Sequence, residues 1–316
     1  MTIESVLRPA GPAAAAGAET GWVLIVGSAL VLMLVGALLA WALLRRRAAG
    51  EQHDERRLVR RWVIGGGLAF PALTMLALFA YATARERAWN PLRTADEPVI
   101  TVTAHLWWWQ VQHRDPARGI DVTLANELHI PAGRPVTIGL ASADVIHALW
   151  LPSLAGKVDA IPGRVLQLRL QADRPGRWQG RCAEFCGEQH ARMGLVLVAH
   201  APDDYARWLA AQARPAAVAD ETLAQQGWRL FMQQRCNSCH ALRGLTESPS
   251  ITAPDLTHVG SRLTIGAGAR PLDRAALAAW IADPQQWKPG VRMPSYGDRL
   301  SAGELDALAA FLERLQ

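Results

Sequence analysis

The stretch Cys182-Ala-Glu184-Phe-Cys186-Gly-Glu-Gln-His190-Ala-Arg-Met193 gathers two thiols, an imidazole and a thioether within one short segment. Soft sulfur ligands combined with imidazole suit copper that changes its oxidation state. Side chains placed this close together in the chain can converge only if a single loop presents them. The stretch therefore predicts a copper-binding loop.

A second imidazole is available from His147, in the upstream segment Asp144-Val-Ile-His147. Two thiolates can bridge two copper ions, and each copper would then take one histidine. Met193 and the backbone carbonyl of Glu184 would be the weak ligands. A single-copper blue site uses one cysteine, two histidines and a methionine, so the second cysteine argues against it. Disulfides within the two close cysteine pairs are the alternative, and the histidine that follows each pair disfavours them.

These motifs resemble the copper A motif of cytochrome c oxidase subunit II. The segments Leu151-Pro-Ser-Leu and Asp159-Ala-Ile-Pro-Gly-Arg164 are also similar to that family, and the resemblance covers about residues 20–210. It implies a two-helix membrane hairpin followed by an all-β, cupredoxin-like Greek-key barrel. It also implies that a dinuclear copper centre is bound by His147, Cys182, Glu184, Cys186, His190 and Met193.

The same resemblance implies two further roles. The carboxylate of Glu184 would help to bind Mg²⁺ at the interface with subunit I, with simple support of the loop as the alternative. In the run His105-Leu-Trp107-Trp108-Trp109, Trp107 would receive electrons from a cytochrome c and Trp109 would pack beneath the copper site. The alternative for this run is a strand of core aromatics, which we favour for Trp108. Little acid follows, so charge steering of a basic cytochrome c is weakly supported.

The pattern around these motifs is that of strands. Short apolar or alternating runs occupy residues 99–102, 136–140, 165–170 and 195–198, and proline–glycine turns separate them. Such spacing predicts an all-β sandwich or barrel. A short helix is expected at 203–213, which gives a copper domain at 95–212.

Two uncharged segments, Trp22–Leu44 and Trp62–Ala84, precede this domain. Each is long enough to cross a bilayer, which takes about 20 apolar residues. We therefore predict a transmembrane hairpin at 21–90 behind a flexible N-terminus at 1–20, with a kink in the second span at Pro71.

Arginines crowd the short connection between the two spans. Because positive residues stay on the cytoplasmic side, the connection is expected in the cytoplasm. Both termini and both redox domains would then be periplasmic, in a bacterial inner membrane. The flanking spans explain this charge as topology, so no nucleic-acid partner is expected. The arginines are Arg45, Arg46, Arg47, Arg56, Arg57, Arg60 and Arg61.

Cys236-Asn-Ser-Cys239-His240 is the attachment motif of a c-type haem, in which both thiols form thioethers and His240 binds the iron. A zinc site needs four ligands and is poorly supported. The second axial ligand should be Met or His, which leaves Met293 and His258. We expect Met293, because Met/His ligation is usual in electron-transfer cytochromes.

This C-terminal part resembles the small class I cytochromes c. Gly227, Phe231, the segment Pro254-Asp-Leu256 and the pair Met293-Pro294 carry the resemblance. It implies an all-α cytochrome c domain at 221–316, behind a linker at 213–220. Ser301 followed by Glu304 is a capping-box pattern that predicts the start of the last helix.

Together these features predict subunit II of a respiratory terminal oxidase with three parts: a two-helix hairpin, a cupredoxin-like barrel and a cytochrome c domain. Electrons from a cytochrome c or a membrane donor would pass through haem c and copper A to subunit I. That subunit, accompanied by subunit III, would reduce O2 to water and translocate protons. The chain would carry no catalytic residue for that step. Alternatives are a copper A subunit of a nitric-oxide reductase and a copper chaperone, which the haem motif disfavours.

Overall fold

A computed structural model describes residues 5–44, 55–89, 99–246 and 252–316. The chain forms two compact units, Ala15–Leu92 and a larger unit made of Met1–Ala14 with Arg93–Gln316. The predicted cytoplasmic arginines at 45–47 lie outside the described residues.

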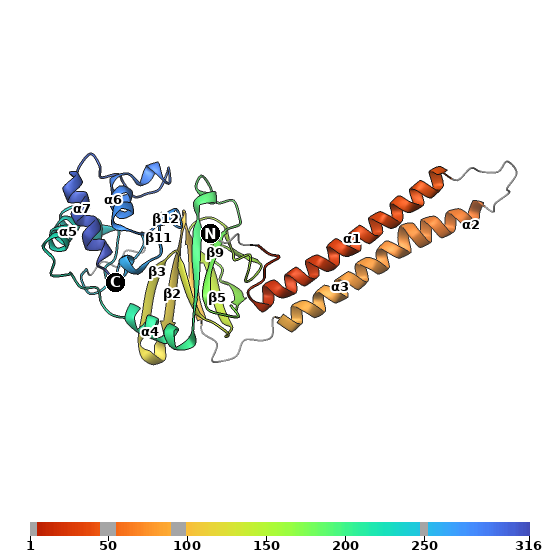
Figure 1. Cartoon of the computed structure of the whole chain (residues 1–316), viewed down its shortest axis with the longest axis horizontal. Helices are drawn as coiled ribbons and strands as arrows, with labels where there is room; N and C mark the ends of the chain where they lie inside the picture. Colours follow the sequence, from red (N-terminus) through yellow and green to blue (C-terminus); the bar gives the residue numbers. More distant parts are fainter. Residues whose placement is uncertain (1–4, 45–54, 90–98, 247–251) are drawn as a thin grey trace. The chain divides into compact units, whose positions relative to one another are not determined.

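The smaller unit consists of long helices that lie side by side (Figure 1). Helix α1 spans Pro12–Leu44, and α2 (Glu55–Val59) leads through a π-helical segment, Arg60–Ala69, into α3 (Phe70–Trp89). Arg85 forms an ion pair with Glu19, so the two long helices are also joined through their side chains. Both are long and apolar enough to cross a membrane.

The start of the chain differs from the expectation of a flexible segment at 1–20. Helix α1 already begins at Pro12, because proline is favourable in the first turn and the alanine-rich run that follows favours helix. Just before it, Ala10 donates to the carbonyl of Ser153 at 2.7 Å, and Asp173 donates to the carbonyl of Ala10 at 2.9 Å. A Cβ atom on Gly11 would lie 2.1 Å from the carbonyl oxygen of Gln171, so only glycine fits this close approach.

The second apolar segment is wound more widely than an α-helix before Pro71. Its π-helical part ends at Phe70, whose N–H donates to the carbonyl of Gly65. π-Helical turns inside helices are rare. Here the unusual winding falls on a run of three glycines, Gly65–Gly67, directly before Pro71, which has no N–H to donate.

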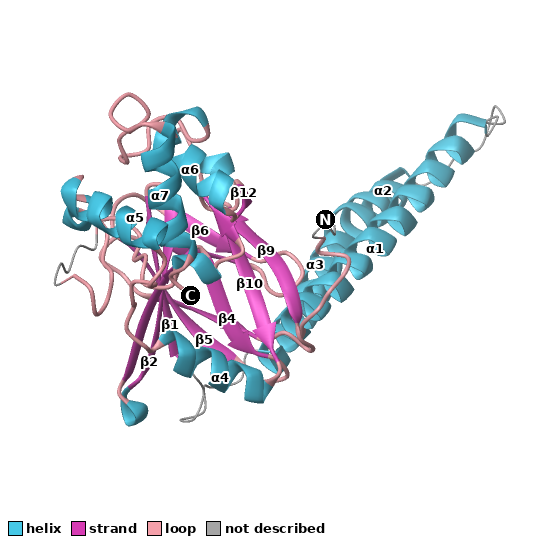
Figure 2. Cartoon of the chain, turned by 60° about the vertical axis from the view of Figure 1, so that its left-hand side comes forward, coloured by secondary structure: helices cyan, strands magenta, loops and turns pink. Residues whose placement is uncertain are grey.

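The first part of the larger unit is a two-sheet Greek-key barrel of the cupredoxin type, seen as the magenta strands in Figure 2. One sheet has the order β3 (Ile120–Ala125), β2 (Trp108–Asp115), β1 (Val99–His105), β5 (Val136–Ser142) and β8 (Leu166–Leu170). The other has the order β4 (Glu127–Pro131), β10 (Gly194–His200), β9 (Gly176–Cys182), β6 (His147–Trp150) and β7 (Lys157–Ala160).

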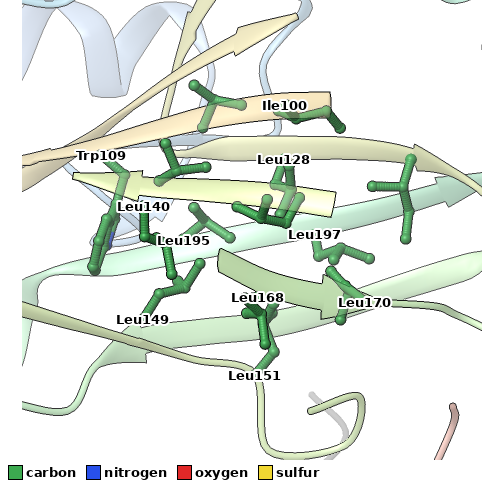
Figure 3. Packing of buried hydrophobic residues seen from close by; sticks show 14 of the residues in the cluster. Ile100, Trp109, Leu128, Leu140, Leu149, Leu151, Leu168, Leu170, Leu195 and Leu197 are labelled. Carbon is green, nitrogen blue, oxygen red and sulfur yellow. The ribbon is translucent and has the colours of Figure 1, made fainter. Parts of the chain in front are cut away.

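The four predicted strand segments are confirmed as β1, β5, β8 and β10. Their inward side chains meet between the sheets in a continuous apolar core, with Trp109 near one end of it (Figure 3). Burial of a single large apolar side chain contributes about 1.5–3 kcal/mol. The core thus supplies a rigid platform for the loops at its ends.

Helix α4 (Pro202–Gln212) closes the barrel and leads into a second core made of helices. Gly227 of the first of these helices is needed for close packing, since a Cβ there would lie 2.0 Å from the carbonyl oxygen of Ala307. The predicted capping box is confirmed, with Ser301 and Glu304 bonded reciprocally. The helices are α5 (Thr222–Gln233), α6 (Arg274–Ala282) and α7 (Ala302–Glu313), and β11 (Thr264–Ile265) pairs with β12 (Arg270–Pro271).

Hydrogen bonds join this helical part to the barrel. The buried carboxylate of Glu127 accepts from the N–H of Leu263 at 2.5 Å. The N–H of Gly194 donates to the carbonyl of Ala267 at 3.0 Å. The two parts are therefore held together by hydrogen bonds as well as by the linker.

Candidate metal centres

Neighbouring strands place the cysteine loop beside the upstream histidine. β9 ends at Cys182 and pairs with β6 so that Cys182 lies opposite Leu149, two residues after His147. The chain then turns through a short 3₁₀ segment, His190–Arg192, before it enters β10. The N–H of Cys182 donates to the carbonyl of Met193 at 3.0 Å and closes the loop.

All six predicted copper ligands lie together. The Sγ atoms of Cys182 and Cys186 are 3.8 Å apart. The Sγ of Cys182 is 3.9 Å from Nδ1 of His147 and 3.2 Å from the carbonyl oxygen of Glu184. The Sγ of Cys186 is 3.7 Å from Nδ1 of His190 and 4.0 Å from Sδ of Met193. Each thiol thus has one imidazole and one weak donor beside it, a donor set that fits two soft copper ions.

The surroundings of His147, Cys182 and Cys186 fix the orientation of the imidazole and change the acidity of the two thiols. His147 is fully buried, and its Nε2 lies 2.8 Å from Oδ1 of Asp144, which fixes the ring with Nδ1 toward the cysteines. Burial raises the pKa of the Cys182 thiol, but hydrogen bonds with His147, with the backbone of Ala148 and Glu184 and with His190 together outweigh it, and the pKa falls below its usual range. Burial and the neighbouring Cys182 raise the pKa of Cys186.

The backbone carbonyl and the side-chain carboxylate of Glu184 have different partners. Its carbonyl faces Cys182, whereas its carboxylate accepts from Nζ of Lys157 at 2.9 Å. Lys157 also lies 3.4 Å from Asp159. An ammonium therefore stands where a Mg²⁺ would have to bind, and the residues of this chain alone do not fit that ion.

The tryptophan run lies against the copper loop. Trp107 donates from Nε1 to the carbonyl of Cys186 at 2.9 Å. Trp109 is fully buried with its ring centroid 6.2 Å from that of His147, so it packs against a predicted copper ligand, in line with the expectation. Trp108 stacks on His105 with centroids 4.4 Å apart. Only Trp107 bonds to the backbone of a predicted ligand.

A cavity of about 600 Å³ lies beside Cys236 and Cys239. Pockets of about 300–1,000 Å³ are typical of ligand and cofactor sites. Its lining is largely apolar on the helical side, and the barrel adds Trp107 and Trp108. The predicted haem ligands that line it are Cys236, Cys239, His240 and Met293.

His240 is oriented for one further bond. Its Nδ1 donates to the carbonyl of Pro254 at 2.7 Å, so Nε2 keeps a free lone pair. Burial lowers the pKa of His240, which favours the neutral form that a metal needs. The rival ligand, His258, instead directs Nε2 to the carbonyl of Arg214 at 2.9 Å and is not among the described residues that line the cavity.

Three contacting residues had no role assigned from the sequence. Asp144 orients His147, Lys157 holds Glu184, and Lys288 donates to the carbonyl of Trp107 at 2.8 Å. The sequence contained one indication that the two lysines are special: Lys157 and Lys288 are the only lysines among the 33 lysine and arginine residues of the chain. Both contact the copper loop or its tryptophan.

Comparison with known proteins gives matches over both parts. Residues 118–200 match the periplasmic domain of cytochrome c oxidase subunit II, and residues 224–316 match cytochrome c. Cytochrome c oxidase subunit 2 of Alkalihalophilus pseudofirmus is 33% identical over 324 residues, which cover 99% of this chain and 91% of that relative. The subunit 2 of Bacillus subtilis is 30% identical over 71% of this chain and 64% of its own length. The solved periplasmic domain of subunit II from Bradyrhizobium japonicum is 27% identical over 38% of this chain and 95% of its own, with a TM-score of 0.35.

Two apolar helices, a cupredoxin-like barrel and a cytochrome c domain define a membrane-anchored electron-transfer subunit of a haem–copper oxidase. The chain belongs to the cytochrome c oxidase subunit 2 family, because it is matched along nearly the whole length of a relative. It is thus an oxidase subunit that works with other subunits and whose domains bind copper and haem. The relatives favour this function over the nitric-oxide reductase alternative.

Proposed function

We propose that His147, Cys182, Cys186, His190, Met193 and the carbonyl of Glu184 hold a dinuclear copper A centre, and that Cys236, Cys239, His240 and Met293 hold a covalent haem c. The convergence of six donor atoms around two thiols 3.8 Å apart carries the copper assignment. The haem assignment is supported by the cavity that the attachment motif and Met293 share. When bound, the two groups supply one-electron carriers whose potentials their surroundings tune.

Trp107 is the residue through which electrons reach the copper loop in this proposal. Trp107 lines the haem cavity and its indole donates to the Cys186 carbonyl, so one residue contacts both sites. The external donor, a cytochrome c or a membrane protein, would deliver electrons to the haem. Tethering the haem to the copper domain raises its effective concentration there and removes the need for strong charge steering.

The partners follow from the direction of transfer. Subunit I would accept electrons from the copper centre and reduce O2 with translocation of protons, and subunit III would complete the complex. The described arginines at the start of the second span, Arg56, Arg57, Arg60 and Arg61, support a cytoplasmic connection. Both termini and both redox domains would then lie on the periplasmic side of a bacterial inner membrane.

Binding of Mg²⁺ by Glu184 stays a prediction. It would require release of the Lys157 ammonium and further oxygen ligands from another subunit, since Mg²⁺ demands near-octahedral oxygen ligation. No step of the electron path depends on it.

The test is metal and haem analysis of the purified complex. Two coppers and one covalently retained haem in this chain, with O2 consumption that stops when either is lost, are expected. One copper in this chain, haem that is released on denaturation, or turnover with nitric oxide but not O2 would refute the proposal.

A further inference from the structure

Lys288 is a buried cation at the contact between the cytochrome domain and the copper domain. Only 2% of its surface is exposed, and lysine is almost never buried to this degree without a partner. In the described part of the chain no carboxylate forms an ion pair with it, and its hydrogen-bond partner is the carbonyl of Trp107, 2.8 Å away. Burial of an ammonium group without a carboxylate partner costs free energy, which suggests that Lys288 has a specific function.

The loop that carries Lys288 also carries Met293. Gln285 braces it, donating from Nε2 to the carbonyls of Val291 at 2.8 Å and Met293 at 3.1 Å. The Gln285 carbonyl oxygen Oε1 in turn accepts from the N–H of Gly290 at 2.8 Å. The loop is therefore one braced unit, and a displacement of Lys288 would be transmitted toward Met293.

Trp107 is held from both sides. Lys288 fixes its backbone carbonyl from the cytochrome domain, and its indole reaches the Cys186 carbonyl in the copper loop. Glycines make room for the ring, because a Cβ on Gly187 would lie 3.3 Å from it and a Cβ on Gly290 would lie 3.5 Å from it. Beside this contact Arg192 of the copper domain donates to the carbonyl of Trp287 at 2.6 Å.

We propose that Lys288 is a positioning residue for electron transfer between the two metal-binding parts: its ammonium locks the Met293 loop onto Trp107 and holds Trp107 against Cys186. The inference rests on the proposed function. A compact ammonium suits this role, since it donates to a single carbonyl without the planar fork of an arginine. Burial and the charge of Arg192 lower the pKa of Lys288 to about 8, which agrees with an enclosed amine.

The scarcity of lysine permits a direct test of the enclosed position. An amine-reactive ester applied under native conditions to the full subunit in detergent, without its partner subunits, can modify only Lys157, Lys288 and the chain terminus. Lys157 is about half exposed, with 48% of its side-chain surface accessible, so it serves as the internal control. Lys288 is expected to react at least about tenfold more slowly than Lys157, because modification requires local opening. Equal rates would overturn the inference.

The role in transfer is tested with Lys288→Met, which keeps the length of the side chain and removes the donor. Haem and copper spectra and both midpoint potentials should be unchanged, while electron transfer from haem to copper slows by about tenfold or more, as expected when a positioning contact is displaced. Lys288→Arg, which keeps a cationic donor, should recover part of the rate. Arg229→Met, on the exposed face of α5, removes the same charge and should have no effect.

A wild-type rate of haem-to-copper transfer in Lys288→Met would overturn the inference. A slower rate would also overturn it if a changed midpoint potential fully explained the difference, or if Lys288→Arg slowed transfer by the same factor. Absence of the copper or haem spectrum in the unmodified protein would instead refute the proposed function. The two failures are therefore distinguishable.

Discussion

Nε1 of Trp107 donates to the backbone carbonyl of Cys186 at 2.9 Å, and Trp107 is also one of the residues that line the cavity beside the haem attachment motif. Trp107 lies in the tight turn between β1 and β2, and this turn brings it into contact with the copper loop. Trp107 thus contacts both predicted redox centres, and loss of its side chain should affect electron transfer more than cofactor binding.

Trp107→Phe keeps an aromatic ring but removes the indole N–H. A neutral hydrogen bond contributes about 1 kcal/mol, which corresponds to about fivefold in rate if it acts fully on the barrier. We therefore expect haem-to-copper transfer, followed by rapid-mixing spectroscopy, to slow by up to about fivefold with both cofactors retained. Trp178→Phe, in β9 and away from the cavity, is the matched control. Equal rates in the two variants would show that Trp107 only packs.

The sequence predicted what is local in the chain. The spacing of Cys182, Cys186, His190 and Met193 identifies the copper loop because a single tight turn presents all four. The capping box at Ser301 follows equally from three-residue spacing. Such patterns need no knowledge of which distant segments meet.

Long-range contacts were not predictable in this way. Lys288 and Trp107 are far apart in sequence, and nothing in either segment signals that they bond. Residues 5–20 were expected to be flexible, because their small side chains show no hydrophobic pattern from which a helix or strand could be predicted. In the structure, the backbone of Ala10 forms hydrogen bonds with Ser153 and Asp173. Backbone contacts of this kind leave no trace in residue type.

Met293→Ala should remove the weak charge-transfer band of Met-ligated ferric haem and lower the midpoint potential, since a thioether favours reduced iron. His258→Ala should leave both properties unchanged, because its ring bonds to the Arg214 carbonyl. That variant should lose only about 1 kcal/mol of stability with this hydrogen bond, because Arg243 also donates to the Arg214 carbonyl. Optical spectra and redox titrations distinguish the two, and control of the spectrum by His258 would mean bis-histidine ligation.

Asp144→Asn should weaken copper binding by about 10–100-fold, because the carboxylate that orients His147 is lost. Copper competition titrations with a chelator measure this directly. Asp121→Asn, an exposed change on β3, is the control. Unchanged affinity in Asp144→Asn would show that barrel packing alone orients the imidazole.

His113 should make the barrel sensitive to acid. Burial lowers the pKa of His113 to about 3, so the folded state holds it neutral while the unfolded state protonates near pH 6.5. Stability is therefore complete above about pH 6.5 and falls toward pH 3, by at most about 1.4 kcal/mol per pH unit for one group. His113→Phe keeps a ring against Trp208 and should make the thermal unfolding midpoint less dependent on pH between pH 4 and 6.5, while His200, whose pKa burial lowers to about 4, still contributes in this range. A pH profile identical to that of the unmodified chain would contradict this origin.

The central claim is that two cysteines share two copper ions, and electron paramagnetic resonance of Cys182→Ser and Cys186→Ser tests it most directly. In the unmodified oxidase the account predicts a mixed-valence signal with hyperfine coupling to two copper nuclei. Each substitution should abolish that signal while the covalent haem spectrum stays. A two-copper signal that survives in either variant, or a one-copper signal in the unmodified protein, would contradict the account.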